Sequence, residues 1–181
     1  MANFIDVLLI DEGLIKSTTN ISDNVSGEYI LPAIKLAQDI DLEAVIGTNL
    51  REALQKKVVD GSIAEENIYK TLLDNYIQPY LTYCTIVHLI PNISWKIANA
   101  GVLTTSDEKM SPVSSIEVDK VKAHYKHLSD VYKDRLQRFL CSNYINFKEL
   151  HSYKSCDEIR ANLYSSASCN LNLGGARGRR K

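Results

Sequence analysis

Two pairs of residues have types and spacings that could do chemistry. Cys84 and His88 are four residues apart in an apolar stretch, so on a helix the thiol and the imidazole would share one face, as a thiolate–imidazolium pair requires. No pocket-forming glycine or third group accompanies them, so we favour core packing and keep a thiol enzyme as the weakest hypothesis. His124 and His127 are three residues apart, a spacing that suits two zinc ligands. Lysines flank this pair and nothing nearby in sequence completes a ligand set, so we favour a solvated helical face.

Three acidic residues, Asp39, Asp41 and Glu43, alternate along a short stretch and could supply the paired carboxylates of general acid–base catalysis. We interpret them as the cover of a solvated turn. The motifs GxGxxG, HExxH and GxSxG are absent, as is a P-loop, so neither a phosphate-binding loop nor a protease or esterase site is indicated. We therefore expect no enzyme, with no catalytic residue, no metal and no cofactor.

The C-terminal sequence GGARGRRK is the strongest local signal. Four positive charges, Arg177, Arg179, Arg180 and Lys181, lie within five residues and are spaced by glycine. Such a segment can neutralise nucleic-acid phosphates without reading sequence, or dock on an acidic protein surface. A solubilising terminus without a partner is the third interpretation, and the residues alone leave the choice open.

Composition indicates one soluble globular domain. The chain has 181 residues, of which 45% are hydrophobic and 24% charged, which is ordinary for a single domain. The net charge of −1 hides an asymmetry: residues 1–60 carry ten acids and five bases, whereas residues 121–181 carry five acids and twelve bases. Ends of opposite charge favour head-to-tail contacts between copies, or docking on an acidic partner.

No feature points to secretion or to a membrane. The four cysteines (Cys84, Cys141, Cys156 and Cys169) form no CxxC pair and are expected to be idle thiols in a reducing compartment. The N-terminus lacks the basic start of a signal peptide. The longest uncharged stretch, residues 75–95, contains two prolines and several polar residues, so we expect a buried helix there and no membrane contact.

Hydrophobic periodicity predicts an all-α helical bundle. A helix is expected to begin around Gly27, and a break at 46–49 to precede a short helix ending near Val59. The pairs Ser62/Glu65 and Ser114/Glu117 read as capping boxes that open two further helices.

Two helices and the feature between them dominate the expected bundle. An apolar helix at about 77–100 should be kinked by Pro91, and a long amphipathic helix is expected at about 115–141. Residues 102–113 between them are predicted to form a projecting loop or small hairpin. The expected organisation is an N-terminal arm (1–27), a helical domain (28–150) and a C-terminal extension with a flexible basic tail (151–181).

The order of these elements resembles the head–tail connector (adaptor, or ring) proteins of tailed bacteriophages, especially those of crAss-like phages. The resemblance covers residues 28–150. Its most specific pieces are Ala33-Ile34-x-x-Ala37-Gln38, Ile46-Gly47-Thr48 and Asn99-Ala100-Gly101-Val102. The extension after about residue 155 has no counterpart in the resemblance.

This resemblance implies a structural virion protein of the neck, made in the bacterial host cytoplasm. Its copies, commonly twelve, would form a ring beneath the portal protein, surround the DNA channel and bind further ring or tail proteins. The inter-ring contacts would come from the termini and from the loop residues Thr104, Thr105, Asp107, Glu108 and Lys109. The alternative function is a nucleic-acid-binding accessory protein that acts through the basic tail.

Overall fold

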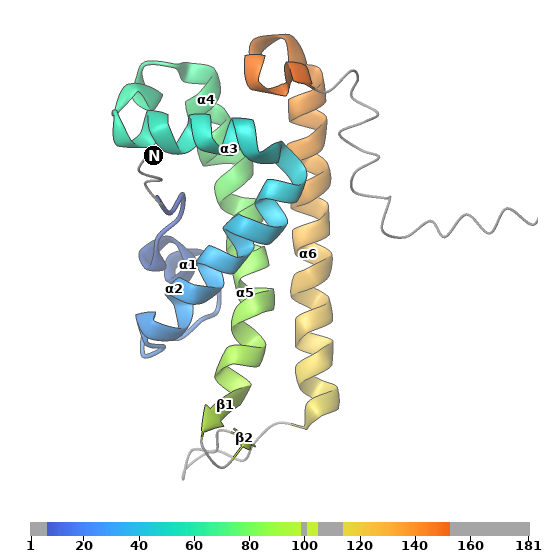
Figure 1. Ribbon diagram of the computed structural model, residues 1–181. Helices are drawn as coiled ribbons and strands as arrows, with labels where there is room; N and C mark the ends of the chain where they lie inside the picture. The colour runs from blue at the N-terminus through green and yellow to red at the C-terminus, as the bar shows by residue number, and fades with distance from the viewer. Residues whose placement is uncertain (1–6, 99–100, 105–113, 153–181) are drawn as a thin grey trace, which may run out of the picture.

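The computed structural model of the protein describes residues 7–98, 101–104 and 114–152, and it is all-α apart from one short hairpin (Figure 1). The all-α prediction is therefore confirmed. In chain order the elements are α1 (Glu12–Thr18), α2 (Gly27–Leu36), η1 (Ala37–Leu42), α3 (Glu43–Val59), η2 (Ser62–Ala64), α4 (Asn67–Leu72), η3 (Leu73–Ile77), α5 (Gln78–Ser94), β1 (Trp95–Ala98), β2 (Gly101–Thr104), α6 (Ser115–Ser142), η4 (Tyr144–Asn146) and η5 (Lys148–Ser152).

Helix α5 is the centre of the bundle, because it packs against both α2 and α6. Figure 1 shows α2 and α6 on opposite sides of α5, with α3 crossing near one end and the hairpin at the other. Aromatic pairs join α6 to the chain around α5: Tyr76 stacks on Phe139 at 4.1 Å, and Tyr83 stacks on Tyr132 at 5.0 Å. Two edges of the bundle are therefore formed by α2 and α6.

The chain from α2 to α3 stays helical until Gly47. Ser26 caps α2 by accepting a hydrogen bond from the backbone N–H of Glu28, and the π-helical segment η1 continues directly into α3. Gly47 has φ 75° and ψ 162°, a conformation that is almost confined to glycine. The predicted break at 46–49 is confirmed, and it folds the second half of α3 back across the bundle.

The expected capping box at Ser62 and Glu65 is wrong. The chain makes a left-handed turn at Gly61 (φ 72°) and a short 3-10 helix instead, and α4 begins only at Asn67. From there the helix runs through the π-helical segment η3 into α5. Pro79 lacks an N–H to bond the preceding turn, and the wider turn of η3 lies where that bond would otherwise form.

The apolar helix is shorter than the predicted 77–100. It ends at Ser94, and Trp95–Ala98 pairs in antiparallel fashion with Gly101–Thr104. Pro91 removes one helix hydrogen bond, and the aromatic and β-branched residues that follow favour a strand. A small hairpin is present, one of the two predicted alternatives, but its strands lie within 95–104 and not within 102–113, and residues 105–113 of the predicted loop lie outside the described chain.

Helix α6 matches the prediction closely. Ser114 and Glu117 form the expected capping box, and the helix ends at Ser142. The predicted apolar stripe is buried unevenly: Leu136 is fully buried, whereas Val121 is 48% exposed. No residue of α6 before Ser129 is buried, so the first half of this helix extends beyond the core.

The core lies among α2, α3, α5 and the C-terminal part of α6. Fully buried side chains come from every one of these elements and from the segment after α6, and include Ile34, Leu50, Leu81, Leu136 and Phe147. None of the helices in the described part of the chain is long and apolar enough to cross a membrane.

Candidate functional site

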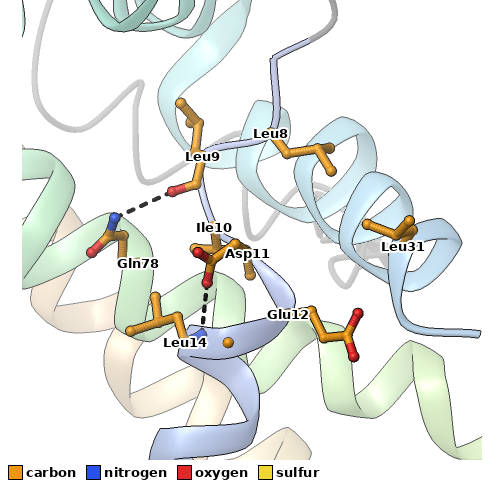
Figure 2. Close-up of a pocket in the computed structure, with 9 residues that line it drawn as sticks. Leu8, Leu9, Ile10, Asp11, Glu12, Leu14, Leu31 and Gln78 are labelled. Carbon is orange, nitrogen blue, oxygen red and sulfur yellow. Dashed lines mark hydrogen bonds between the residues drawn. The ribbon is translucent and has the colours of Figure 1, made fainter. Parts of the chain in front are cut away.

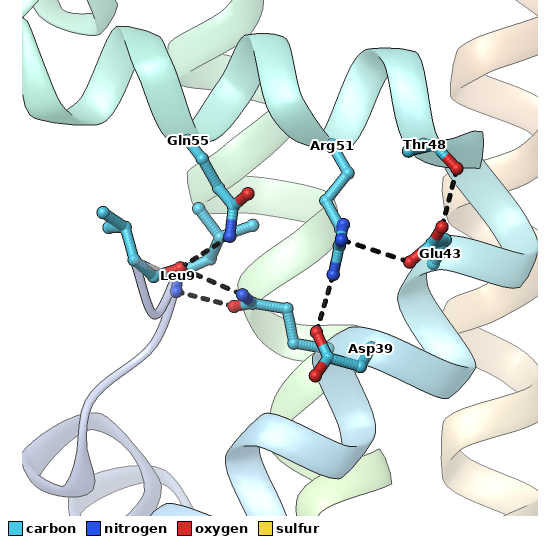
Figure 3. Close-up of polar contacts among 8 residues, drawn as sticks. Leu9, Asp39, Glu43, Thr48, Arg51 and Gln55 are labelled. Atoms are coloured by element: carbon cyan, nitrogen blue, oxygen red, sulfur yellow. Dashed lines mark hydrogen bonds and ion pairs between the residues drawn. The ribbon is translucent and has the colours of Figure 1, made fainter. Parts of the chain in front are cut away.

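Three glutamine side chains hold the chain that precedes α1. The amide of Gln38, in η1, makes two bonds to it: the Leu9 backbone N–H donates to Gln38 Oε1 at 3.0 Å, and Gln38 Nε2 donates to the Val7 carbonyl at 2.9 Å. Gln55 Nε2, from α3, donates to the same Val7 carbonyl at 3.0 Å (Figure 3). Gln78 Nε2, from α5, donates to the Leu9 carbonyl at 3.3 Å. We call Gln38, Gln55 and Gln78 the glutamine clasp.

The glutamine clasp binds main-chain atoms, and apolar burial completes the contact. Leu9 and Ile10 are each only 4% exposed, and Gln38 is fully buried. A site that pairs backbone groups and buries neighbouring apolar side chains has chemistry that a peptide-binding site also uses. Here the occupant is the protein's own N-terminal arm.

Beside the glutamine clasp, Arg51 is buried in an ion-pair cluster. Its Nη1 lies 2.6 Å from Asp39 Oδ1 and its Nη2 lies 3.3 Å from Glu43 Oε2, while the Arg51 side chain is only 8% exposed. Thr48 Oγ1 donates to Glu43 at 2.6 Å (Figure 3). The interpretation of these acids as a solvated turn is therefore wrong, because the bend at Gly47 brings Arg51 back onto η1.

The third acid of that stretch, Asp41, pairs with α5. Asp41 Oδ2 lies 2.6 Å from His88 Nε2, and the hydroxyl of Tyr80 donates to the Asp41 carbonyl at 3.3 Å. Asp41 therefore also has a packing role, which joins η1 to the central helix.

Cys84 lies one turn from His88 but does not form a reactive thiol. It is 4% exposed and hydrogen-bonds with Tyr80 and Ser129. Burial, followed by the charge of Asp41, raises the pKa of Cys84 to about 12. A nucleophile must be deprotonated, so the thiol is inert near neutral pH and core packing is the better interpretation.

The two histidines of α6 are exposed, as expected for a solvated helical face. His124 lies edge-on to Tyr125, with ring centroids 5.5 Å apart. Among the residues that the structure describes, no group of three or more His, Cys, Asp or Glu side chains could hold a metal ion.

An open groove of about 750 Å³ lies next to the clasped arm (Figure 2). Leu8, Leu14 and Leu31 give it an apolar lining, and Asp11 and Glu12 bring two carboxylates to it. Asp11 also caps α1, since it accepts the Leu14 N–H at 2.7 Å, and Glu12 pairs with the lysine one turn later. Leu31 is 48% exposed, so an apolar side chain from another segment can still cover it.

The two edges of the bundle also expose apolar side chains. On the α2 edge, which continues into η1, Leu36 is 40% and Ile40 is 55% exposed. On the α6 edge, Ile116 is 67% and Val131 is 44% exposed. We call these surfaces the α2 edge and the α6 edge.

Most residues singled out in the sequence for partner contacts are not among those described. Thr104 ends β2, where its backbone pairs with Trp95. The remaining loop and tail residues lie outside the described ranges, and their roles stay predictions: Thr105, Asp107, Glu108, Lys109, Arg177, Arg179, Arg180 and Lys181.

Sequence reasoning missed the glutamine clasp and Arg51. A signal was present for Gln38, which follows Ile30 and Ile34 at helical spacing and therefore lies on the apolar face of its helix. A polar residue on such a face requires a hydrogen-bonding partner. The partner, an N-terminal backbone segment, could not be identified from spacing.

Comparison with known proteins identifies one family. Residues 42–160 match DUF6712, a family of unknown function. No curated protein and no solved structure matches the chain significantly. The family match begins at the end of η1 and runs through α6, so it includes the Arg51 and Gln55 side of the site but not the arm. Since the match covers more than half of the chain, this protein belongs to the DUF6712 family.

Proposed function

We propose that this protein is a structural subunit of the head–tail connector of a tailed bacteriophage. In this proposal its copies form a ring of twelve between the portal protein and the tail, and the ring surrounds the DNA channel. The order of sequence motifs supports the proposal through the resemblance described above. The observation that carries it is the pair of open edges on opposite sides of α5.

Each edge has the properties of a subunit contact. The side chains on the inner side of α2, such as Ile30 and Ile34, are fully buried against the bundle, whereas Leu36 is exposed on the outer side. Likewise Leu136 of α6 is fully buried and Val131 is exposed. Two different surfaces on opposite sides of one subunit favour a head-to-tail contact, which closes into a ring when the rotation between copies allows it.

The charges of the two sides are complementary. Residues 7–60, which include the α2 edge, carry nine acidic and five basic side chains, and residues 114–152, which include the α6 edge, carry five acidic and seven basic ones. Placing the α6 edge of one copy against the α2 edge of the next brings opposite net charges together. This arrangement steers association and disfavours contacts between like edges.

The length of α6 fits contacts along the axis of a stack of rings. With 28 residues it extends over roughly 42 Å at 1.5 Å per residue. Its first half and the hairpin lie at the end of the bundle away from α3 (Figure 1). In the proposal this end contacts a neighbouring ring through the hairpin and the loop that follows it.

Cysteine cross-linking tests the edge contact. A chain carrying both Leu36→Cys and Val131→Cys should give a ladder of covalent multimers with a short bismaleimide, because each copy can link to two neighbours. Either single variant should give no ladder, and the parent chain controls for the native cysteines. Both edges are exposed, so the variants should fold normally. The absence of a ladder at concentrations where copies associate, or a ladder from one single variant, would contradict the proposed contact.

A further inference from the structure

We infer that the groove beside α1 binds the C-terminal segment of a second copy, residues 171–181. The inference rests on the side-by-side packing proposed above and adds a second link between neighbouring subunits. The segment reads LNLGGARGRRK, which places two leucines before four basic residues.

The groove offers matching chemistry to the leucines of this segment and to its basic residues. Leu8, Leu14 and Leu31 form an apolar lining for leucine side chains. Asp11 and Glu12 lie at the groove, within a stretch, residues 7–34, that has four acidic residues and one basic residue. The basic residue, Lys16, already pairs with Glu12, so a net negative charge remains to attract the arginines.

The groove is formed where the chain is held firmly. The glutamine clasp fixes the main chain at Val7 and Leu9, and the next residues turn into α1, so Leu8 and Leu14 are presented by a fixed backbone (Figure 2). Leu31 projects toward the same groove from α2. A binding surface that already has its shape in the free protein loses little entropy when a segment docks.

Chain length and direction favour a second copy as the source. The described chain ends at Ser152, in the segment that follows α6, whereas the groove lies on the side of α1 and α2. With the α6 edge of one copy against the α2 edge of the next, the tail of the first copy follows α6, the helix that faces the groove side of the second copy. Residues 153–170 span at most about 60 Å when extended, which is enough to reach it.

Peptide binding to the full-length protein tests the inference. The four basic residues of the tail are replaced in the tested protein, so that its tails no longer occupy the groove. The substitutions are Arg177→Ala, Arg179→Ala, Arg180→Ala and Lys181→Ala. The probe is a fluorescent peptide of residues 170–181, followed by anisotropy. We expect saturable binding that weakens about tenfold in a Leu31→Ser variant, because an apolar contact is lost. Val59→Ser is the matched control: Val59 is 47% exposed, close to the 48% of Leu31, it lies outside both edges and does not line the groove, and its substitution should leave binding unchanged.

A second probe checks the apolar part of the contact, since the same peptide with serine at positions 171 and 173 should bind about tenfold more weakly. Equal binding to the Leu31→Ser and Val59→Ser variants would overturn the inference, as would no binding to the protein. Binding that requires removal of residues 1–6 would assign the groove to the N-terminal segment and also overturn it. A peptide that binds duplex DNA but not the protein would favour the nucleic-acid function of the tail. None of these outcomes depends on ring formation. If only the edge contact failed, the cross-linking ladder would be absent while the peptide still bound the groove.

Discussion

Arg51 Nη1 lies 2.6 Å from Asp39 Oδ1, and this bond ties the second half of α3 to the π-helical segment before the Gly47 bend. Glu43 provides a second carboxylate at 3.3 Å. The Arg51 side chain is buried while both acids are partly exposed. The three side chains therefore stabilise the bend that brings Arg51 and Gln55 onto the rest of the site.

Removing the arginine should cost more stability than removing one of its acids. We expect Arg51→Met to lower the free energy of unfolding by about 3 kcal/mol, because Asp39 and Glu43 both lose the buried guanidinium that pairs with them. Asp39→Asn should lower it by about 1 kcal/mol, because Glu43 still pairs with the guanidinium. Urea unfolding of both variants measures the difference. Equal losses would mean that Glu43 contributes nothing to holding Arg51.

The bend itself depends on the backbone of Gly47. A side chain at φ 75° and ψ 162° is strained, so we expect Gly47→Ala to lower the free energy of unfolding by about 2–3 kcal/mol. Gly61→Ala is the matched control, since Gly61 (φ 72°, ψ −1°) has open space around it and should cost about 1 kcal/mol. Thermal unfolding of the two variants gives the comparison. A larger loss at Gly61 would contradict the role given to the bend.

The glutamine clasp predicts protection of one particular amide. The Leu9 N–H donates to Gln38 Oε1, so Gln38→Leu should speed hydrogen exchange at Leu9 and lower the free energy of unfolding by about 2 kcal/mol. Gln78→Leu removes only a bond to the Leu9 carbonyl and should leave exchange at this amide much slower than in the Gln38 variant. Hydrogen exchange detected by NMR measures the protection of the Leu9 amide directly. Unchanged exchange in Gln38→Leu would show that the bond to Gln38 does not protect this amide.

Buried Cys84 and the buried tyrosines predict a loss of stability at alkaline pH. Burial raises the pKa of Cys84 from its ordinary value of 9.0 to about 12. Between these values the unfolded chain releases the thiol proton and the folded chain keeps it, so the free energy of unfolding falls as pH rises above 9. Burial also raises the pKa of Tyr80, which adds a similar loss above pH 10.

Two variants separate these contributions. Cys84→Ala should flatten the decline already between pH 9 and 10, by up to about 1.4 kcal/mol per pH unit. Tyr80→Phe should flatten it only above pH 10, apart from a constant loss of one hydrogen bond to Asp41. Urea unfolding across this pH range provides the test. A decline that is unchanged in Cys84→Ala would mean that the thiol is accessible in the folded protein.

Local sequence signals predicted much of the fold and little of the site. The Ser114/Glu117 cap, the bend at 46–49 and α6 each follow from chemistry within a few neighbouring residues. The sequence pattern places the end of α5 six residues too late, because hydrophobicity does not distinguish a buried helix from a strand after Pro91. The glutamine clasp joins segments 29 to 69 residues apart. Hydrophobic periodicity shows which residues share a face of one element, so it does not indicate contacts between segments so far apart in sequence.

The most direct test of the central claim, a stoichiometric ring in the phage neck, is to count this protein in purified particles. Quantitative mass spectrometry of gradient-purified particles from the producing phage would compare its copy number with that of the portal protein. The account predicts nearly equal numbers of the two. Absence of this protein from the particles would contradict the connector function and leave a helical binding protein whose partner must be sought elsewhere.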